Sequence, residues 1–409
     1  MKSGRARWIL TSLRYGLCVA AIWYLIMVVP WNDHVTLSDT AKTRVRLIEQ
    51  RGDEYVIFRD GRQEVIPASG VFQIEDGDHL LPQIELGIPS VVKGTDKLWA
   101  IWALLLFVPV PILAAIRLVW MLRIQEVHLS LWQSIKLTFA GNFFNFALPG
   151  MTGGDLIKAY YITRFTHRKT EAVTTVFLDR VVGLSSLVLM AGAMIFLTRD
   201  PSQFGQMVIL LGVVFGGLAV AGVLVFSQRV RRILRLGRLI DLLPMSDQLH
   251  RIGGATLAVR HNKALVTLSL LVTFLLQTIV IISASVMAMK ALGMEGRFTH
   301  YFIYIAIGFL ISAVPISPPQ AFGVMEFFYI QFFTYGGQNS ASQAVALALA
   351  VRLIQLFWSL PGVLVPLLGA HLPARAELEA LEKNNGDATT PAGNGEHNSN
   401  EPQPAASGQ

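Results

Sequence analysis

Long runs of apolar residues alternate with short polar segments along most of the chain. A run of roughly 20 helical residues is long enough to cross a hydrocarbon core about 30 Å thick. Six runs meet this length, at 8–30, 98–122, 171–198, 205–227, 263–291 and 341–371. Two further runs, 131–149 and 301–335, are apolar but interrupted by Gly and Pro, so neither is expected to be one continuous span. The pattern predicts an all-α polytopic membrane protein with about six spanning helices and two broken segments.

Residues 32–97 depart from this pattern and are predicted to form a small β-rich domain. Within them, two strand-like stretches flank Asp60-Gly61, a dipeptide typical of hairpin turns. The last residues, from about 384, are rich in Asn, Gly, Pro and Ser and have no apolar face, so we expect them to be disordered. The predicted organisation is an anchor helix at 1–31, the β-rich domain at 32–97, a membrane domain at 98–371 and a tail at 372–409.

The loop at 228–263 orients the predicted helices. It carries eight Lys or Arg and two Asp, and basic loops of this kind stay in the cytoplasm. Counting from it places both termini in the cytoplasm and 32–97 outside. The segment 131–165 must then be a re-entrant hairpin open to the cytoplasm, and 301–335 must enter from the outer side. The order of span, broken hairpin and span occurs in 98–198 and again, inverted, in 263–371, as in many transporters.

Composition supports a membrane location and argues against several other classes. The chain is 53% hydrophobic and only 15% charged, which is unusual for a soluble domain. Its net charge of +7 is spread over short loops, so membrane orientation explains it better than nucleic acid. No metal-ligand cluster, Ser-His-Asp set or nucleotide-binding loop is present. We therefore expect a protein of the bacterial inner membrane that has no cofactor or metal and is not an enzyme.

Two motifs with Pro, Gly and a carboxylate fall in the broken segments. In N-F-F-N-F-A-L-P-G-M-T-G-G-D-L-I-K-A-Y, glycines would let the backbone turn and approach a ligand closely. Asp155 and Lys158 follow, three residues apart on one helix face, where they could form an ion pair. In V-P-I-S-P-P-Q-A-F-G-V-M-E-F-F, Glu326 follows Gly323 at the start of an apolar helix. Both motifs predict a polar cavity, because broken backbone inside a membrane must face protein or water.

Charged residues inside the expected spans need partners or a function, because a charge at bilayer depth costs at least about 2.5 kcal/mol. Arg117 and Lys290 lie near span ends, and we expect them to reach the headgroups. The others, together with the motif residues, form the predicted substrate site: Asn142, Asn145, Gly153, Gly154, Asp155, Lys158, Asp179, Arg180, Glu326 and Arg352.

These motifs, with A-V-T-T-V-F-L-D-R-V-V-G-L and V-R-L-I, resemble the lysylphosphatidylglycerol synthase transmembrane family. This is a flippase-like superfamily that includes the membrane half of the multiple peptide resistance factor. The resemblance covers about 98–371 and implies spanning plus re-entrant helices, with lipid translocation in the best-known members. Family members usually have Arg where Lys158 stands. They commonly have S-P-G-G-L-G where this chain has Ser317-Pro318-Pro319-Gln320-Ala321-Phe322-Gly323, so a stiffer second hairpin is expected.

Three functions are consistent with these observations. The leading hypothesis is a flippase or transporter for an anionic phospholipid or a polyprenyl-linked lipid. The second is a membrane-embedded transferase with a lipid-linked donor, in which Asp155 or Glu326 would be the general base. The third is a noncatalytic scaffold that recruits an envelope protein through 32–97 and would tolerate neutralisation of the buried charges.

Overall fold

The computed structural model describes residues 26–40, 42–52, 54–59, 61–76, 79–82, 84–147, 153–198, 263–312, 319–334 and 339–367, with a few single residues elsewhere. Four regions discussed above lie wholly or largely outside them. These are the expected spans at 8–30 and 205–227, the basic loop at 228–263 and the polar tail from about 384.

The described residues between 34 and 85 contain seven strands. Five form an antiparallel sheet in the order β4-β3-β2-β1-β7, and β5 pairs with β6. The strands are β1 (His34–Thr36), β2 (Arg44–Arg51), β3 (Glu54–Arg59), β4 (Arg62–Pro67), β5 (Gln73–Asp76), β6 (His79–Pro82) and β7 (Ile84–Glu85), with a short helix η1 (Ala68–Gly70). Arg59 is paired with Arg62 across the β3–β4 turn, where Gly61 has φ +82°, so the hairpin was correctly predicted.

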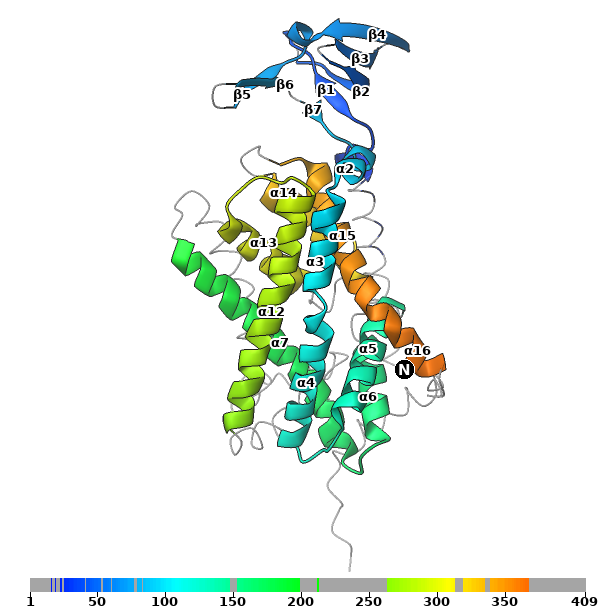
Figure 1. Cartoon of the computed structure of the whole chain (residues 1–409), viewed down its shortest axis with the longest axis vertical. Helices are drawn as coiled ribbons and strands as arrows, with labels where there is room; N and C mark the ends of the chain where they lie inside the picture. The colour runs from blue at the N-terminus through cyan, green and yellow to red at the C-terminus, as the bar shows by residue number, and fades with distance from the viewer. Residues whose placement is uncertain are drawn as a thin grey trace, which may run out of the picture. The chain divides into compact units, whose positions relative to one another are not determined.

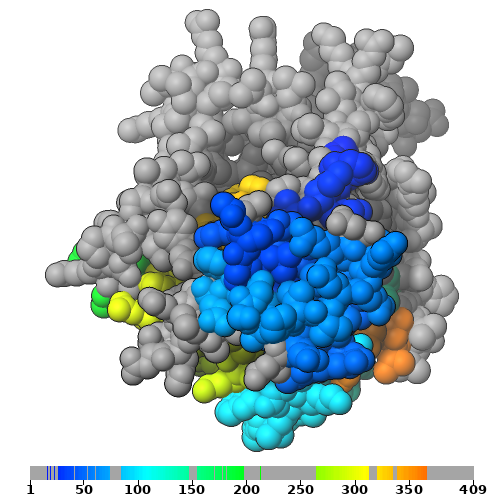
Figure 2. Space-filling view, turned by 90° about the horizontal axis from the view of Figure 1, so that it is seen from above, coloured from blue at the N-terminus to red at the C-terminus, as the bar shows by residue number. Residues whose placement is uncertain are grey.

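Alternating side chains of these strands form a small apolar core. Val35, Val45, Leu47 and Ile57 are buried together with neighbouring apolar residues. In Figure 2 the blue residues of the strands form one continuous body. Just before β1, the Asp33 carboxylate accepts a 2.7 Å hydrogen bond from the Gly87 amide, so the beginning and the end of the strand region are tied together.

Four helical runs are long and apolar enough to cross a membrane. They are Lys97–Ile124, Glu171–Leu197, Ala264–Ala291 and Ala341–Val363, and they coincide with four of the expected spans. The first consists of α3 (Lys97–Leu106) and α4 (Pro109–Ile124), the second of α7 (Lys169–Thr198), the third of α12 (Lys263–Val286) and the π-helical η2 (Met287–Ala291), and the last of α15 (Ala341–Ser359) and η4 (Leu360–Val363). A short helix, α2 (Ile88–Gly94), precedes them and α16 (Leu364–Leu367) follows.

The outer faces of these helices are apolar. Leu98, Trp102, Leu271 and Leu353 are each more than half exposed, and only 28% of the most apolar part of the first run is buried. Apolar faces of this extent are stable when lipid covers them. The inner faces meet in one apolar core with contributions from α3, α4, α7, α12, α13, α14 and α15. The chain therefore has the architecture of an α-helical membrane protein.

Two pairs of shorter helices lie between the long ones, where the sequence predicted broken hairpins (Figure 1). The first pair is α5 (Leu131–Ala147) and α6 (Gly153–Thr163). The second is α13 (Phe298–Ser312) and α14 (Val324–Phe333), with a short turn, η3 (Pro319–Ala321), just before α14. Because α5 is unbroken as far as Ala147, the expected interruption within 131–149 falls only at its end. The order of long helix, two short helices and long helix occurs twice.

The two pairs start from opposite ends of the long helices. α5 follows the end of α4, whereas α13 starts beside the start of α3 and α15, where the Asp96 amide bonds to the Ala291 carbonyl and Gln343 bonds to Leu292. Within the second pair, Tyr304 stacks on Phe332 at 5.3 Å, so α14 runs back along α13. Their entry from opposite sides of a membrane stays a prediction.

Candidate functional site

Glu326, on the first turn of α14, is completely buried with 0% exposure. Its carboxylate forms a two-pronged ion pair with the Arg352 guanidinium of α15, with Oε2 3.0 Å from Nη2 and Oε1 bonded to Nη1. Oε2 also accepts a 2.8 Å hydrogen bond from the Gly323 amide, which caps α14. The expectation that a basic side chain faces Glu326 inside the bundle is confirmed.

Arg352 also holds the turn that precedes α14. Its Nε donates to the Gln320 carbonyl and its Nη2 to the Ala321 carbonyl, both at 3.1 Å. Gln320 and Ala321 have φ of 55° and 49°, a left-handed conformation that non-glycine residues seldom adopt. Two charge-assisted hydrogen bonds therefore stabilise a strained backbone at the tip of the second helix pair.

The tip of each helix pair is the end at which its two helices are joined, and the two tips are in contact. The Gln320 side-chain amide donates a 2.7 Å hydrogen bond to the backbone carbonyl of Asn145, near the end of α5. This bond places the two predicted motifs next to each other, although 175 residues separate these positions. Gln320 was not among the predicted site residues, because a neutral amide in a Pro-rich turn can equally well face solvent.

Glycines bring α5 and α6 into backbone contact. A Cβ built on Gly154 would lie 1.9 Å from the Gly141 carbonyl oxygen, a distance that no side chain can occupy. The Asn145 side-chain oxygen accepts a 3.1 Å hydrogen bond from the Gly154 amide. The close approach predicted for Gly154 is therefore an approach to another helix rather than to a ligand. Gly153 is the first residue of α6.

Asp155 pairs with Arg180 of α7, and not with Lys158 as the helix spacing had suggested. Arg180 reaches Asp155 because α7 packs directly on α6. The side chains of Asp155 and Arg180 are 13% and 27% exposed, so this pair is only partly buried.

Asp179 pairs with Arg117 of α4. The contact is bidentate, with Nε–Oδ1 at 2.6 Å and Nη2–Oδ2 at 2.7 Å, and Arg117 also donates to the Thr273 hydroxyl of α12. Arg117 is only 7% exposed, so the expectation that it reaches the headgroups is wrong. The position of Arg117 along its own helix could not predict that Asp179 would face it from α7. Lys290 is exposed, 5.9 Å from the Trp99 ring centre.

Lys158 and Asn142 complete the set of predicted residues. Lys158 is 8% exposed, and its Cε packs on the bare backbone of Gly141. Among the residues that the structure describes, no carboxylate lies within ion-pair distance of its ammonium. Asn142 is half-buried on α5.

Comparison with protein-family models matches residues 87–362 to the family described as lysylphosphatidylglycerol synthase TM region. The chain belongs to this family. The match covers more than half of the 409 residues and includes α2 through most of η4. No curated protein and no solved structure matches the chain. The membrane location and a connection with lipids therefore rest on the family together with the apolar helices.

Two departures from the family's sequence pattern acquire a structural meaning. The Pro-rich turn departs from the S-P-G-G-L-G pattern that is common in the family, and within it Gln320 and Ala321 have a left-handed, glycine-like backbone that Arg352 holds in place. Lys158 stands where Arg is usual, and a Lys ammonium is a single point charge without the planar fork of Arg.

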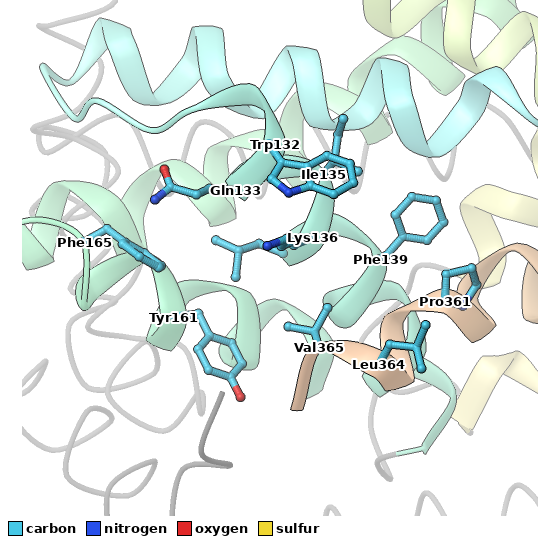
Figure 3. Close-up of a pocket in the computed structure, with 11 residues that line it drawn as sticks. Trp132, Gln133, Ile135, Lys136, Phe139, Tyr161, Phe165, Pro361, Leu364 and Val365 are labelled. Atoms are coloured by element: carbon cyan, nitrogen blue, oxygen red, sulfur yellow. The ribbon is translucent and has the colours of Figure 1, made fainter. Parts of the chain in front are cut away.

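A cavity of about 610 Å³ lies between α5, α6, η4 and α16 (Figure 3). Apolar side chains such as Trp132, Phe139 and Leu364 make up most of its wall, with Lys136 and Tyr161 among the polar ones. The sequence predicted a polar cavity, but this one is mainly apolar and none of the ten predicted site residues lines it. Within the described ranges, no cluster of three or more His, Cys, Asp or Glu could hold a metal ion.

Proposed function

We propose that this protein moves an anionic lipid across the membrane, with the headgroup passing the tips of the two helix pairs. The observation that carries the proposal is the hydrogen bond from Gln320 to Asn145, which joins the tips. Around it lie a left-handed turn and two ion pairs, inside a bundle whose outer surface is apolar. Charged groups are costly at this depth, so their concentration around one point favours a role in transport.

The apolar cavity supports a lipid substrate. Its volume of about 610 Å³ suits an acyl chain, and its wall offers mostly carbon atoms. Lys136, at this wall and near the Trp132 ring, could contact a phosphate at the membrane surface. The family membership supports the same class of substrate.

The geometry favours transport over a transferase reaction. A general base must be free to accept a proton from its substrate. Glu326 is fully buried and bonded to Arg352 and the Gly323 amide, and Asp155 is paired with Arg180. Neither carboxylate is available as a base in this conformation, so the transferase remains the second candidate.

Fluorescent phosphatidylglycerol in proteoliposomes tests the proposal. Purified protein should expose inner-leaflet probe to a membrane-impermeant quencher. Gln320→Leu should change the rate of this transfer about threefold, because the hydrogen bond that it removes is worth about 0.6 kcal/mol. Lys290→Gln, at an exposed position away from the tips, is the control and should transfer normally. Mass spectrometry of the recovered lipid separates the alternatives: a transporter leaves it unchanged, whereas a transferase alters it covalently. The scaffold hypothesis would be supported instead if transfer were normal in Gln320→Leu and in variants of Asp155, Asp179, Glu326 and Arg352.

A further inference from the structure

One buried cation of the helix bundle has no carboxylate partner among the described residues. Three carboxylates are each paired with one arginine, in Asp155–Arg180, Asp179–Arg117 and Glu326–Arg352. Lys158 is the fourth cation of this set, and it has no carboxylate partner among the described residues. The connecting segments 148–152 and 313–318 contain no charged residue in the sequence, so they supply no counter-charge.

The position of Lys158 favours a ligand over a purely structural role. Its stem is packed against Gly141, with Cε above the glycine backbone, so the ammonium is held between α5 and α6. The residue is more than nine-tenths buried. Its Nζ has no hydrogen-bond partner among the described residues, and the protein does not enclose this atom completely. One side of the ammonium therefore stays accessible.

Resting on the proposed function, we infer that Lys158 binds the phosphate of the lipid, and that the site takes a headgroup with one net negative charge. The three arginines are not available, because each is held by a carboxylate that would be left as an unpaired buried or half-buried charge. A phosphodiester whose substituent is uncharged, as in phosphatidylglycerol, neutralises Lys158. A diphosphate brings a second negative charge that Lys158 alone does not neutralise, and a zwitterionic headgroup brings a cation that Lys158 repels as a like charge.

Equilibrium binding to the detergent-purified full chain tests this inference independently of transport. The probes are phosphatidylglycerol, phosphatidylcholine and a polyprenyl diphosphate, measured by native mass spectrometry. The wild type should bind phosphatidylglycerol at least tenfold more tightly than the other two, a difference of about 1.4 kcal/mol. Lys158→Met keeps the stem that packs on Gly141 and should lose the preference, whereas Lys158→Arg should keep it. Lys290→Met, at an exposed position in η2 near the Trp99 ring, is the matched control and should bind as the wild type does.

Each result decides the inference. Equal binding of the three lipids by the wild type, or tighter binding of the diphosphate, overturns the monoanionic class even if the variants fail to fold. An unchanged preference in a folded Lys158→Met overturns the role of Lys158. Selective binding without any transfer in proteoliposomes supports this inference while the proposed function fails. Transfer without a Lys158-dependent preference shows the reverse.

Discussion

Removing the charge of Arg352 should destabilise the protein more than removing that of Glu326. Arg352→Gln leaves the fully buried Glu326 carboxylate with only the Gly323 amide. Breaking a buried ion pair in this way costs about 3–5 kcal/mol. It also removes the donors of the Gln320 and Ala321 carbonyls. Hydrogen bonds in helical membrane proteins average about 0.6 kcal/mol, so the two together add about 1 kcal/mol.

We therefore expect Arg352→Gln to lower the free energy of unfolding by about 4–6 kcal/mol and Glu326→Gln by about 3–5 kcal/mol. In the double variant, both charges are absent and two neutral amides can bond to each other. The unpaired-charge penalty then disappears, and the loss should fall to about 1–2 kcal/mol. Reversible unfolding in mixed micelles, measured for the wild type, both single variants and the double variant, gives the coupling energy directly.

The double-mutant cycle can refute this reasoning. Additive losses would mean that the two side chains do not interact in the folded protein, whatever their distance. Equal stability of Arg352→Gln and the wild type would show that the left-handed turn at Gln320 and Ala321 does not depend on the guanidinium.

Three further predictions follow from single contacts. Gly154→Ala should force α5 and α6 apart, because its Cβ would meet a backbone carbonyl at 1.9 Å. Such overpacking typically costs about 1–3 kcal/mol of stability, so the unfolding midpoint should fall. An unchanged midpoint would contradict the contact. Tyr329→Phe should leave stability equal or higher in the same assay, because the Tyr329 hydroxyl is buried without a hydrogen-bond partner in the described part of the chain; a clear loss would reveal a partner. Single cysteines at Ser38 and Ser399 should react with an impermeant reagent from opposite sides of the membrane, and labelling from one side would refute the predicted topology.

The sequence predicted the helical elements well because their signal is local. Four expected spans coincide with long apolar helices, and Asp60-Gly61 correctly marked a hairpin. Interruptions by Pro and Gly correctly located the two pairs of short helices, but not the end of α5. An apolar run shows where a chain can be helical, whereas the place where α5 gives way to α6 depends on the close packing of Gly141 and Gly154.

The candidate site was harder to predict, because ion pairs form between helices that are distant in sequence. Glu326 and Arg352 were both recognised as charges that need a partner, and they do pair. Asp155 was assigned to Lys158 by helix spacing, but Arg180 approaches it from α7. The position of Arg117 near the end of its helix predicted the membrane surface, but it carries no information on Asp179, which reaches Arg117 from α7. Periodicity specifies one face of a helix, but it does not specify which helix covers that face.

The distribution of the ion pairs bears on how the two halves of the bundle could move. Asp155–Arg180 and Asp179–Arg117 lie entirely within 98–198, and Glu326–Arg352 lies entirely within 263–371. The tips of the halves are joined by the neutral hydrogen bond from Gln320 to Asn145. Separating the tips therefore breaks a bond of about 0.6 kcal/mol, whereas separating any ion pair would cost several times more. If the protein is a transporter as proposed, one half can move against the other while Arg117, Arg180 and Arg352 keep their carboxylate partners. Among the described residues Lys158 has no carboxylate partner, so in the proposed mechanism it is the cation that the lipid phosphate would neutralise.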